Sequence, residues 1–201
     1  MQSTLISAAE KMGVSLNAAQ AQALIDFLQL ILQWNKTYNL SSIRNFDEGL
    51  GKHLLDSLSI LPYINSQKLL DIGSGAGLPG IVISIMRPDL AVSVLDSVGK
   101  KCRFMQFVKT QLGLKNLTII NSRVQDFQPE ICFGQITSRA FAKMDKTLEL
   151  SQHLLCDNGV YWFMKGANFQ QERLPDGAKI HQLSVPKVSD ERFLLEIRAE
   201  K

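Results

Sequence analysis

The sequence has no long hydrophobic run. Its longest apolar-looking segment, residues 23–34, is interrupted by Asp26, Gln29 and Gln33. It is therefore too polar for a membrane-spanning helix, which needs about 20 predominantly apolar residues. The N-terminus also lacks the basic and then apolar order of a signal peptide. We therefore expect a cytoplasmic protein that contacts no membrane.

Cysteine is also scarce. The three cysteines, Cys102, Cys132 and Cys156, show no CxxC spacing. This pattern argues against a metal site and favours free thiols in a reducing cytoplasm. With 201 residues, 45% of them hydrophobic and 20% charged, the chain is typical of one globular domain with a small appendage. We expect a helical extension at 1–65, a ligand-binding domain at 66–201 and a monomeric protein.

Positive charge is concentrated in the middle of the chain. The formal net charge is only +3, but residues 66–150 hold eleven Lys and Arg against seven acids. Four of these cations, Lys100, Lys101, Arg103 and Lys109, belong to one predicted helix. Such a face would attract a polyanion such as RNA. A solvated helix face explains the same charges, so the charge pattern leaves both interpretations open.

A glycine-rich stretch at 68–80, KLLDIGSGAGLPG, reads as a buried strand that leads through a turn into a helix. Gly73, Gly75 and Gly77 permit positive φ and a close approach of the backbone to a ligand. Pro79 suits the first turn of the helix that follows. A turn without any ligand is the alternative, but three glycines cost conformational entropy that a bare turn does not require.

Two classes of nucleotide-like ligand use such a turn. Residues 75–80 satisfy the dinucleotide pattern GxGxxG, and Asp96 ends the next apolar run, where a ribose-binding acid is expected. Asp71 and Gly73 extend the pattern to Asp-x-Gly-x-Gly-x-Gly. This longer string resembles motif I of the class I S-adenosylmethionine methyltransferases, whose ligand offers a ribose diol and an amino-acid tail.

Alternating apolar strands and helices predict a doubly wound α/β fold. Two helices come first, one capped by Asn17 and one that begins at Asn45 and ends before Pro62. The expected strands are 68–72, 91–96, 117–121, 132–138, 159–165, 180–185 and 193–197, with helices at 79–87, 98–112 and 145–155. No helix separates the last two strands, so we expect an antiparallel pair at the edge of a mostly parallel, seven-stranded sheet. This order resembles the methyltransferase variant of the Rossmann topology.

Several further strings carry a more specific resemblance. They are WNKTYNL at 34–40, HLLDS at 53–57, DIGSGAGLPG at 71–80, LDS at 95–97, GKK at 99–101, SRV at 122–124, SRAFA at 138–142 and KG at 165–166. In order and spacing they are similar to those of the bacterial small-subunit ribosomal RNA guanine-N7 methyltransferases, historically called glucose-inhibited division protein B. The resemblance implies S-adenosylmethionine as cofactor and 16S ribosomal RNA, or the small ribosomal subunit, as partner.

The resemblance also implies roles for individual residues. The implied cofactor-binding residues are Asp71, Gly73, Gly75, Gly77, Leu78, Asp96, Val124, Gln125 and Arg139. Arg139 is an implied catalytic residue. Phe141 is a second catalytic candidate, because its position in the loop after the strand at 132–138 lies near the expected methyl donor, where it would stack on the target guanine. The RNA-binding candidates are Lys100, Lys101, Arg103, Arg123 and Lys165. Two positions depart from the family pattern. Gln125 stands where family members commonly have an acid, and Ser41 stands where Thr is usual.

The chemistry of guanine N7 agrees with the lack of a catalytic triad. N7 carries an in-plane lone pair and no proton, so it can attack a methyl sulfonium without a general base. Rate enhancement would come mostly from alignment of the reactants, which can supply about 7–11 kcal/mol. A donor on N7 would block the nucleophile, so Arg139 is expected to bind the cofactor carboxylate, O6 or a phosphate. We interpret His53 as a packed histidine and Trp34 as part of the core.

Two other classes of protein remain as alternatives. A nicotinamide-dependent oxidoreductase fits the GxGxxG submatch, but the helices before the first strand and the paired strands at the end argue against it. A non-catalytic RNA-binding protein fits the basic helix but needs no intact glycine loop.

Overall fold

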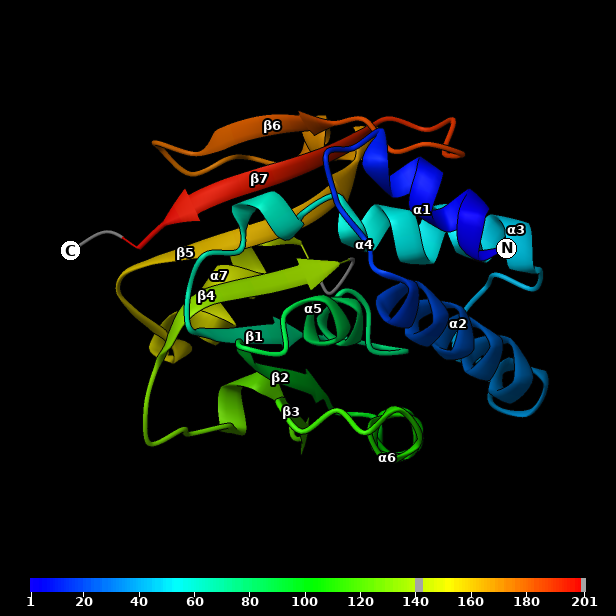
Figure 1. Cartoon of the computed structure of the whole chain (residues 1–201). Helices are drawn as coiled ribbons and strands as arrows, with labels where there is room; N and C mark the ends of the chain where they lie inside the picture. Colours follow the sequence, from blue (N-terminus) through cyan, green and yellow to red (C-terminus); the bar gives the residue numbers. More distant parts are fainter. Residues whose placement is uncertain (140–142, 200–201) are drawn as a thin grey trace.

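The chain folds around one seven-stranded sheet in a computed structural model that describes residues 1–139 and 143–199. The strand order is β3-β2-β1-β4-β5-β7-β6, from bottom to top in Figure 1. The strands are β1 (Lys68–Ile72), β2 (Ala91–Asp96), β3 (Leu117–Asn121), β4 (Phe133–Arg139), β5 (Leu155–Gly166), β6 (Lys179–Leu183) and β7 (Arg192–Arg198). The first five are parallel, whereas β7 is antiparallel to both β5 and β6. The predicted topology is therefore confirmed.

Helices cover both faces of the sheet (Figure 1). The segments between strands contain α5 (Gly80–Met86), α6 (Gly99–Leu112), α7 (Met144–Ser151), and 3-10 turns at Val124–Asp126, Gln152–Leu154 and Ala167–Gln171. Successive side chains of β1 face opposite sides: Leu69 joins the core under α5 and α6, and Leu70 joins the core under α7. The side chains of Leu69 and Leu70 are both fully buried. Burial on both faces explains why these strands read as continuous apolar runs.

The N-terminal helices pack on the α5 and α6 side. They are α1 (Gln2–Glu10), α2 (Ala18–Tyr38), α3 (Phe46–Gly49), the π-helix Leu50–Leu55 and α4 (Asp56–Leu58), followed by a 3-10 turn at Leu61–Tyr63. Asn17 caps α2 through a capping box with Gln20, and Asn45 accepts from the Glu48 backbone N–H at 2.9 Å. Trp34 packs on Phe104 as expected, with ring centroids 5.3 Å apart. The domain boundary at residue 65 remains a prediction.

Two sequence-based expectations are wrong near the start of β5. The helix expected at 145–155 ends at Ser151, because residues from Leu155 onward already belong to β5, opposite Phe133 of β4. This pairing also brings Cys132 and Cys156 together in a disulfide. The expectation of three free thiols is thus wrong for this pair, and only the buried Cys102 is free. A separation of 24 residues hides such a pairing from spacing rules.

No helix in the described part of the chain is long and apolar enough to cross a membrane. The strand order reverses between β1 and β4, which lie side by side although β2 and β3 come between them in the sequence. In open α/β sheets, ligands bind beyond the carboxyl ends of the strands at such a switch point. The glycine-rich turn after β1 lies there.

Candidate active site

The glycine-rich turn leaves β1 with three residues in the left-handed region. Gly73, Gly75 and Gly77 have φ values of 66°, 61° and 90°. The turn is held to β2 because the backbone N–H groups of Gly73 and Ser74 both donate to the carbonyl of Leu95, at 2.8 and 3.1 Å. A Cβ atom on Gly75 would meet no atom closer than 3.9 Å. The turn is therefore tightly formed but open on its outer side.

Asp71 supports this turn from beneath. Its carboxyl group is fully buried and accepts from the backbone N–H of Gly80, at the start of α5, at 2.9 Å. Burial raises the pKa of Asp71 to about 7, against the opposing effect of the Gly80 hydrogen bond. Asp71 lines none of the cavities described below. Its geometry is that of a brace for the turn, and direct contact with a cofactor remains a prediction.

Asp96, at the end of β2, holds the outer side of the turn. One carboxylate oxygen accepts from the backbone N–H of Gly75 and the other from that of Val98, both at 2.9 Å. The ammonium group of Lys101 lies 3.5 Å from the first oxygen. A carboxylate offers about four lone-pair positions, so Asp96 retains capacity for further donors.

Two cavities meet at this turn. The β2–β3 cavity, as we call it, measures about 380 Å³ and is lined by Gly73, Leu95, Asp96, Ser97, Val98, Lys101, Ser122, Arg123, Val124 and Gln125. The central cavity measures about 510 Å³ and extends from Gly73, Ser74, Gly75 and Leu78 to Arg139. Gly73 and Lys101 line both. The structure thus brings together most of the predicted cofactor residues, whereas Asp71 and Gly77 line neither cavity.

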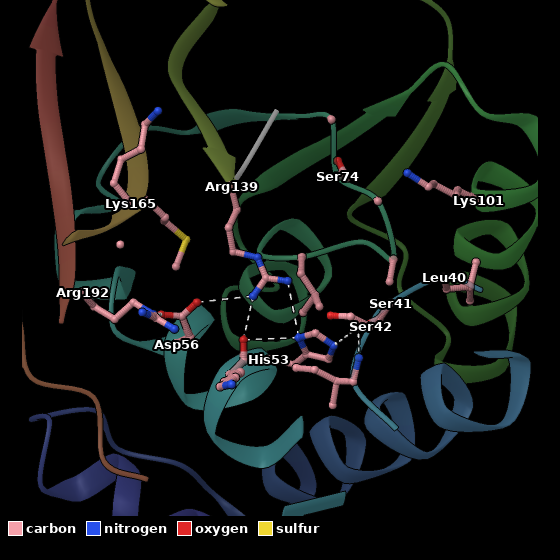
Figure 2. A pocket seen from close by; sticks show the side chains of 18 residues that line it. Leu40, Ser41, Ser42, His53, Asp56, Ser74, Lys101, Arg139, Lys165 and Arg192 are labelled. Atoms are coloured by element: carbon pink, nitrogen blue, oxygen red, sulfur yellow. Dashed lines mark hydrogen bonds and ion pairs between the residues drawn. The ribbon is translucent and has the colours of Figure 1, made fainter. Parts of the chain in front are cut away.

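A buried ion-pair network forms the floor of the central cavity (Figure 2). Arg139, at the end of β4, donates to the carbonyl oxygen of Lys52 at 2.7 Å and to Asp56 at 3.3 Å. Arg192, at the start of β7, lies 3.3 Å from the other oxygen of Asp56. Burial raises the pKa of Asp56, although both arginines oppose this effect. One carboxylate from α4 therefore holds two guanidinium groups from separate strands.

His53 is buried beside this network. Its Nε2 lies 2.8 Å from the hydroxyl oxygen of Ser41. Burial and then the charge of Arg139 lower the pKa of His53 to about 4, so the imidazole is neutral at physiological pH. His53 is thus buried, as interpreted, but it also lines the central cavity, so its lack of a catalytic or ligand-binding role stays a prediction. Its neutrality means that it adds no positive charge to the cavity.

The sequence analysis did not identify Asp56, Arg192 or Lys52 as site residues. The signal available for Asp56 was its position three residues after His53, which places both side chains on one helix face. Arg192 carried no local signal, because it lies 53 residues beyond Arg139 and enters the site only through the antiparallel strand β7.

The RNA-binding candidates occupy different surroundings. Lys100, Arg103 and Arg123 are exposed, whereas Lys101 is half-buried between the two cavities. Lys165, at the end of β5, lines the central cavity and pairs with Glu172 at 2.8 Å. Phe141 lies outside the described residues. The basic helix therefore presents only part of its charge to solvent.

Solved structures of known proteins share this fold. A tRNA methyltransferase from Aquifex aeolicus superposes with a TM-score of 0.57 at 15% identity, covering 73% of this chain and 69% of the other. A SAM-dependent methyltransferase from the same organism gives 0.56 at 17% identity, over 72% and 90%. Together with the glycine turn at the switch point, these similarities define a class I methyltransferase fold.

Sequence comparison gives the family. A chain from Ruthia magnifica, named ribosomal RNA small subunit methyltransferase G, is 60% identical over 98% of this chain and 97% of its own. One of the same name from Methylobacillus flagellatus is 40% identical over the full length of both. The profile of the family described as rRNA small subunit methyltransferase G matches residues 20–195. The chain belongs to this family of methyltransferases.

Proposed function

We propose that this protein transfers the methyl group of S-adenosylmethionine to N7 of a guanine in 16S ribosomal RNA. The observation that carries the proposal is the arrangement of the glycine turn, which lies between the β2–β3 cavity and the central cavity. Asp96 faces the first cavity and Arg139 the second. Family membership supports small-subunit ribosomal RNA as the substrate.

The residues present fit the cofactor. Val124 and Gln125 line the end of the β2–β3 cavity where the adenine would lie, next to Asp96 for the ribose hydroxyls. The methionine portion would cross Gly75, where the space that a Cβ would occupy is free of close neighbours. The departure at Gln125 leaves backbone contacts to the adenine possible, because Gln125 follows Val124 in a 3-10 turn that lines the cavity.

When bound, S-adenosylmethionine supplies an electrophilic methyl group, and the protein has to align it with the acceptor. N7 requires no deprotonation, so the neutral His53 and the absence of a triad are compatible with this reaction. Arg139 has donors beyond those used by Lys52 and Asp56 and could bind O6, a phosphate or the cofactor carboxylate. Phe141 is proposed to stack on the guanine.

The family assignment argues against the two alternatives. A nicotinamide-dependent oxidoreductase would not be expected among relatives named methyltransferases. A non-catalytic RNA-binding protein would not need the preserved turn, in which three glycines have positive φ. We further propose that the protein acts as a monomer in the cytoplasm, where ribosomal RNA is located.

Methyl transfer from tritiated S-adenosylmethionine to ribosomal RNA tests the proposal, followed by mapping of the labelled base and of the labelled ring position. We expect label on a single guanine at N7. Naked 16S RNA and the assembled small subunit should be tested in parallel. Label on another base or another ring atom, or no label on either substrate, would contradict the proposal.

Two variants separate the basic helix from the central cavity. Replacing the exposed Lys100 and Arg103 by Ala should raise KM for RNA and flatten its salt dependence, because each lost phosphate contact removes about one unit of slope. Arg139→Ala should instead lower kcat or cofactor affinity, with little change in the salt slope. An unchanged slope in the double variant would identify the basic helix as a solvated face.

A further inference from the structure

A third cavity adjoins the central cavity on the side away from the glycine turn. This flanking cavity, as we call it, measures about 620 Å³ and lies at the ends of β5 and β7. Met164, Lys165, Gly166 and Arg192 line both the central and the flanking cavity. The two cavities are therefore adjacent and share part of their lining. The volume of the flanking cavity falls in the range of about 300–1,000 Å³ that is usual for small-molecule sites.

The flanking cavity combines an apolar floor with cationic edges. Met164 and Phe169 are buried, and the Phe169 ring packs on Phe193 with centroids 4.9 Å apart. The exposed Asn168 adds an amide that can both donate and accept hydrogen bonds. A nucleotide has matching parts, because its base offers an apolar face and a polar edge and its phosphate is an anion.

The charges of the flanking cavity favour an anion. Glu172 pairs with Lys165 at 2.8 Å, and Asp190 lies 3.7 Å from Arg192, so both acids of the lining are already neutralised. Lys143 is exposed and lines the flanking cavity and a smaller neighbouring cavity of about 160 Å³, but not the central cavity. Within residues 1–139 and 143–199, Lys143 forms no ion pair. It is therefore available to a phosphate.

The chemistry of the substrate calls for a binding surface beside the central cavity. Guanine N7 faces the major groove, and the major groove of an RNA helix is too deep and narrow for protein side chains. The target guanine must therefore leave its stack, as bases do in other enzymes that modify them. The nucleotide next to it loses its stacking partner and needs a surface of its own.

We propose that the flanking cavity binds the nucleotide adjacent to the target guanine in the RNA strand. Its base rests on Met164 and Phe169, Asn168 contacts the base edge, and Lys143 binds the phosphate. This assignment rests on the proposed function, because it requires the target guanine to occupy the central cavity.

Lys143→Ala tests the assignment, with Lys146→Ala as the matched control. Lys146 is an exposed lysine three residues away that pairs with Glu149 at 2.9 Å and lines none of the three cavities. Initial rates of RNA methylation are measured against RNA concentration at several salt concentrations. Lys143→Ala should raise KM for RNA about tenfold, the effect of losing a hydrogen bond to a charged group. It should also lower the salt slope by about 0.7, the value for one phosphate of a single strand.

Lys146→Ala should match the wild type in KM and slope, and both variants should keep the wild-type kcat and the wild-type affinity for S-adenosylhomocysteine. Equal KM and slope in the two variants would overturn the assignment. A loss of cofactor affinity in Lys143→Ala alone would also overturn it, since the flanking cavity would then serve the cofactor. Neither result affects the proposed function, which is judged by methylation with the wild-type enzyme.

A second measurement addresses the base. RNA that lacks the base next to the target should have a raised KM with the wild-type enzyme. With Asn168→Ala, the same omission should raise KM by a smaller factor, because the contact to the base edge is already lost. Identical factors for the two enzymes would show that Asn168 does not contact that base.

Discussion

Asp56→Ala should destabilise the protein strongly, because the substitution leaves two guanidinium groups without their shared carboxylate. The Asp56 side chain is only 6% exposed, and those of Arg139 and Arg192 are 23% and 18% exposed. Removing one partner of a buried ion pair costs about 3–5 kcal/mol, whereas exposed pairs contribute about 0–1 kcal/mol. Arg139 keeps its hydrogen bond to the Lys52 carbonyl, so we expect the lower end, about 3 kcal/mol.

Urea denaturation measures this loss directly. The midpoint should fall without a change in the slope of the free energy of unfolding against urea. For a chain of this length, a loss of about 3 kcal/mol lowers Tm by about 6–12 °C. Asp47→Ala is the matched control, because the Asp47 side chain is 86% exposed and pairs with Lys187 at 3.4 Å. That control should cost less than about 0.5 kcal/mol.

A loss below about 1 kcal/mol for Asp56→Ala, similar to that of the control, would refute the reasoning. It would mean that water solvates both arginines as well as the carboxylate does. If the reasoning holds, residual methyl transfer by the folded fraction should also be reduced, because Arg139 loses one of the contacts that orient it.

Three further predictions concern the glycine turn. Asp96→Asn should weaken binding of S-adenosylhomocysteine by about 1.5–3 kcal/mol in titration calorimetry, and unchanged affinity would remove Asp96 from the site. Gly75→Val should abolish this binding for two reasons. The φ of Gly75 is 61°, which a residue with a side chain resists, and the added side chain would fill the open space beside the turn that the cofactor is proposed to cross. Wild-type affinity would exclude the turn as a binding element. The pKa of Asp71 is about 7 in the folded protein against 3.8 when solvated, so the folded state loses stability relative to the unfolded state as pH rises from about 4 to about 7. In urea titrations, the free energy of unfolding of the wild type should fall by about 4 kcal/mol relative to that of Asp71→Asn across this pH window. If the free energies of the two proteins changed in parallel with pH, the raised pKa of Asp71 would be contradicted.

Local residue patterns were sufficient to predict most of the fold. The apolar runs of β1 and β2 gave the correct strand bounds, because strands buried on both faces need continuous apolar residues. Asn17 was recognised as a helix cap because its hydrogen bond reaches only three residues along the chain. The glycines of the turn were predicted to have positive φ, a property that depends on the absence of a side chain.

The bounds of α7 and β5 could not be obtained in this way. Residues from Leu155 onward join the sheet because they meet β4, and this tertiary contact overrides the local helical pattern. Lys101 illustrates the same limit for a side chain. Its sequence neighbours Lys100 and Arg103 are exposed, but the helix turns Lys101 toward Asp96.

The sequence by itself thus determined the order of strands and helices, the glycine turn and the position of Asp96 at the end of β2. These features depend on residues within a few positions of one another. Only the tertiary structure decided that Asp56 holds Arg139 and Arg192, that Cys132 meets Cys156, and that a flanking cavity adjoins the central one. These features join segments distant in the sequence, 83 residues apart for Asp56 and Arg139, and such pairs meet only after the sheet has assembled.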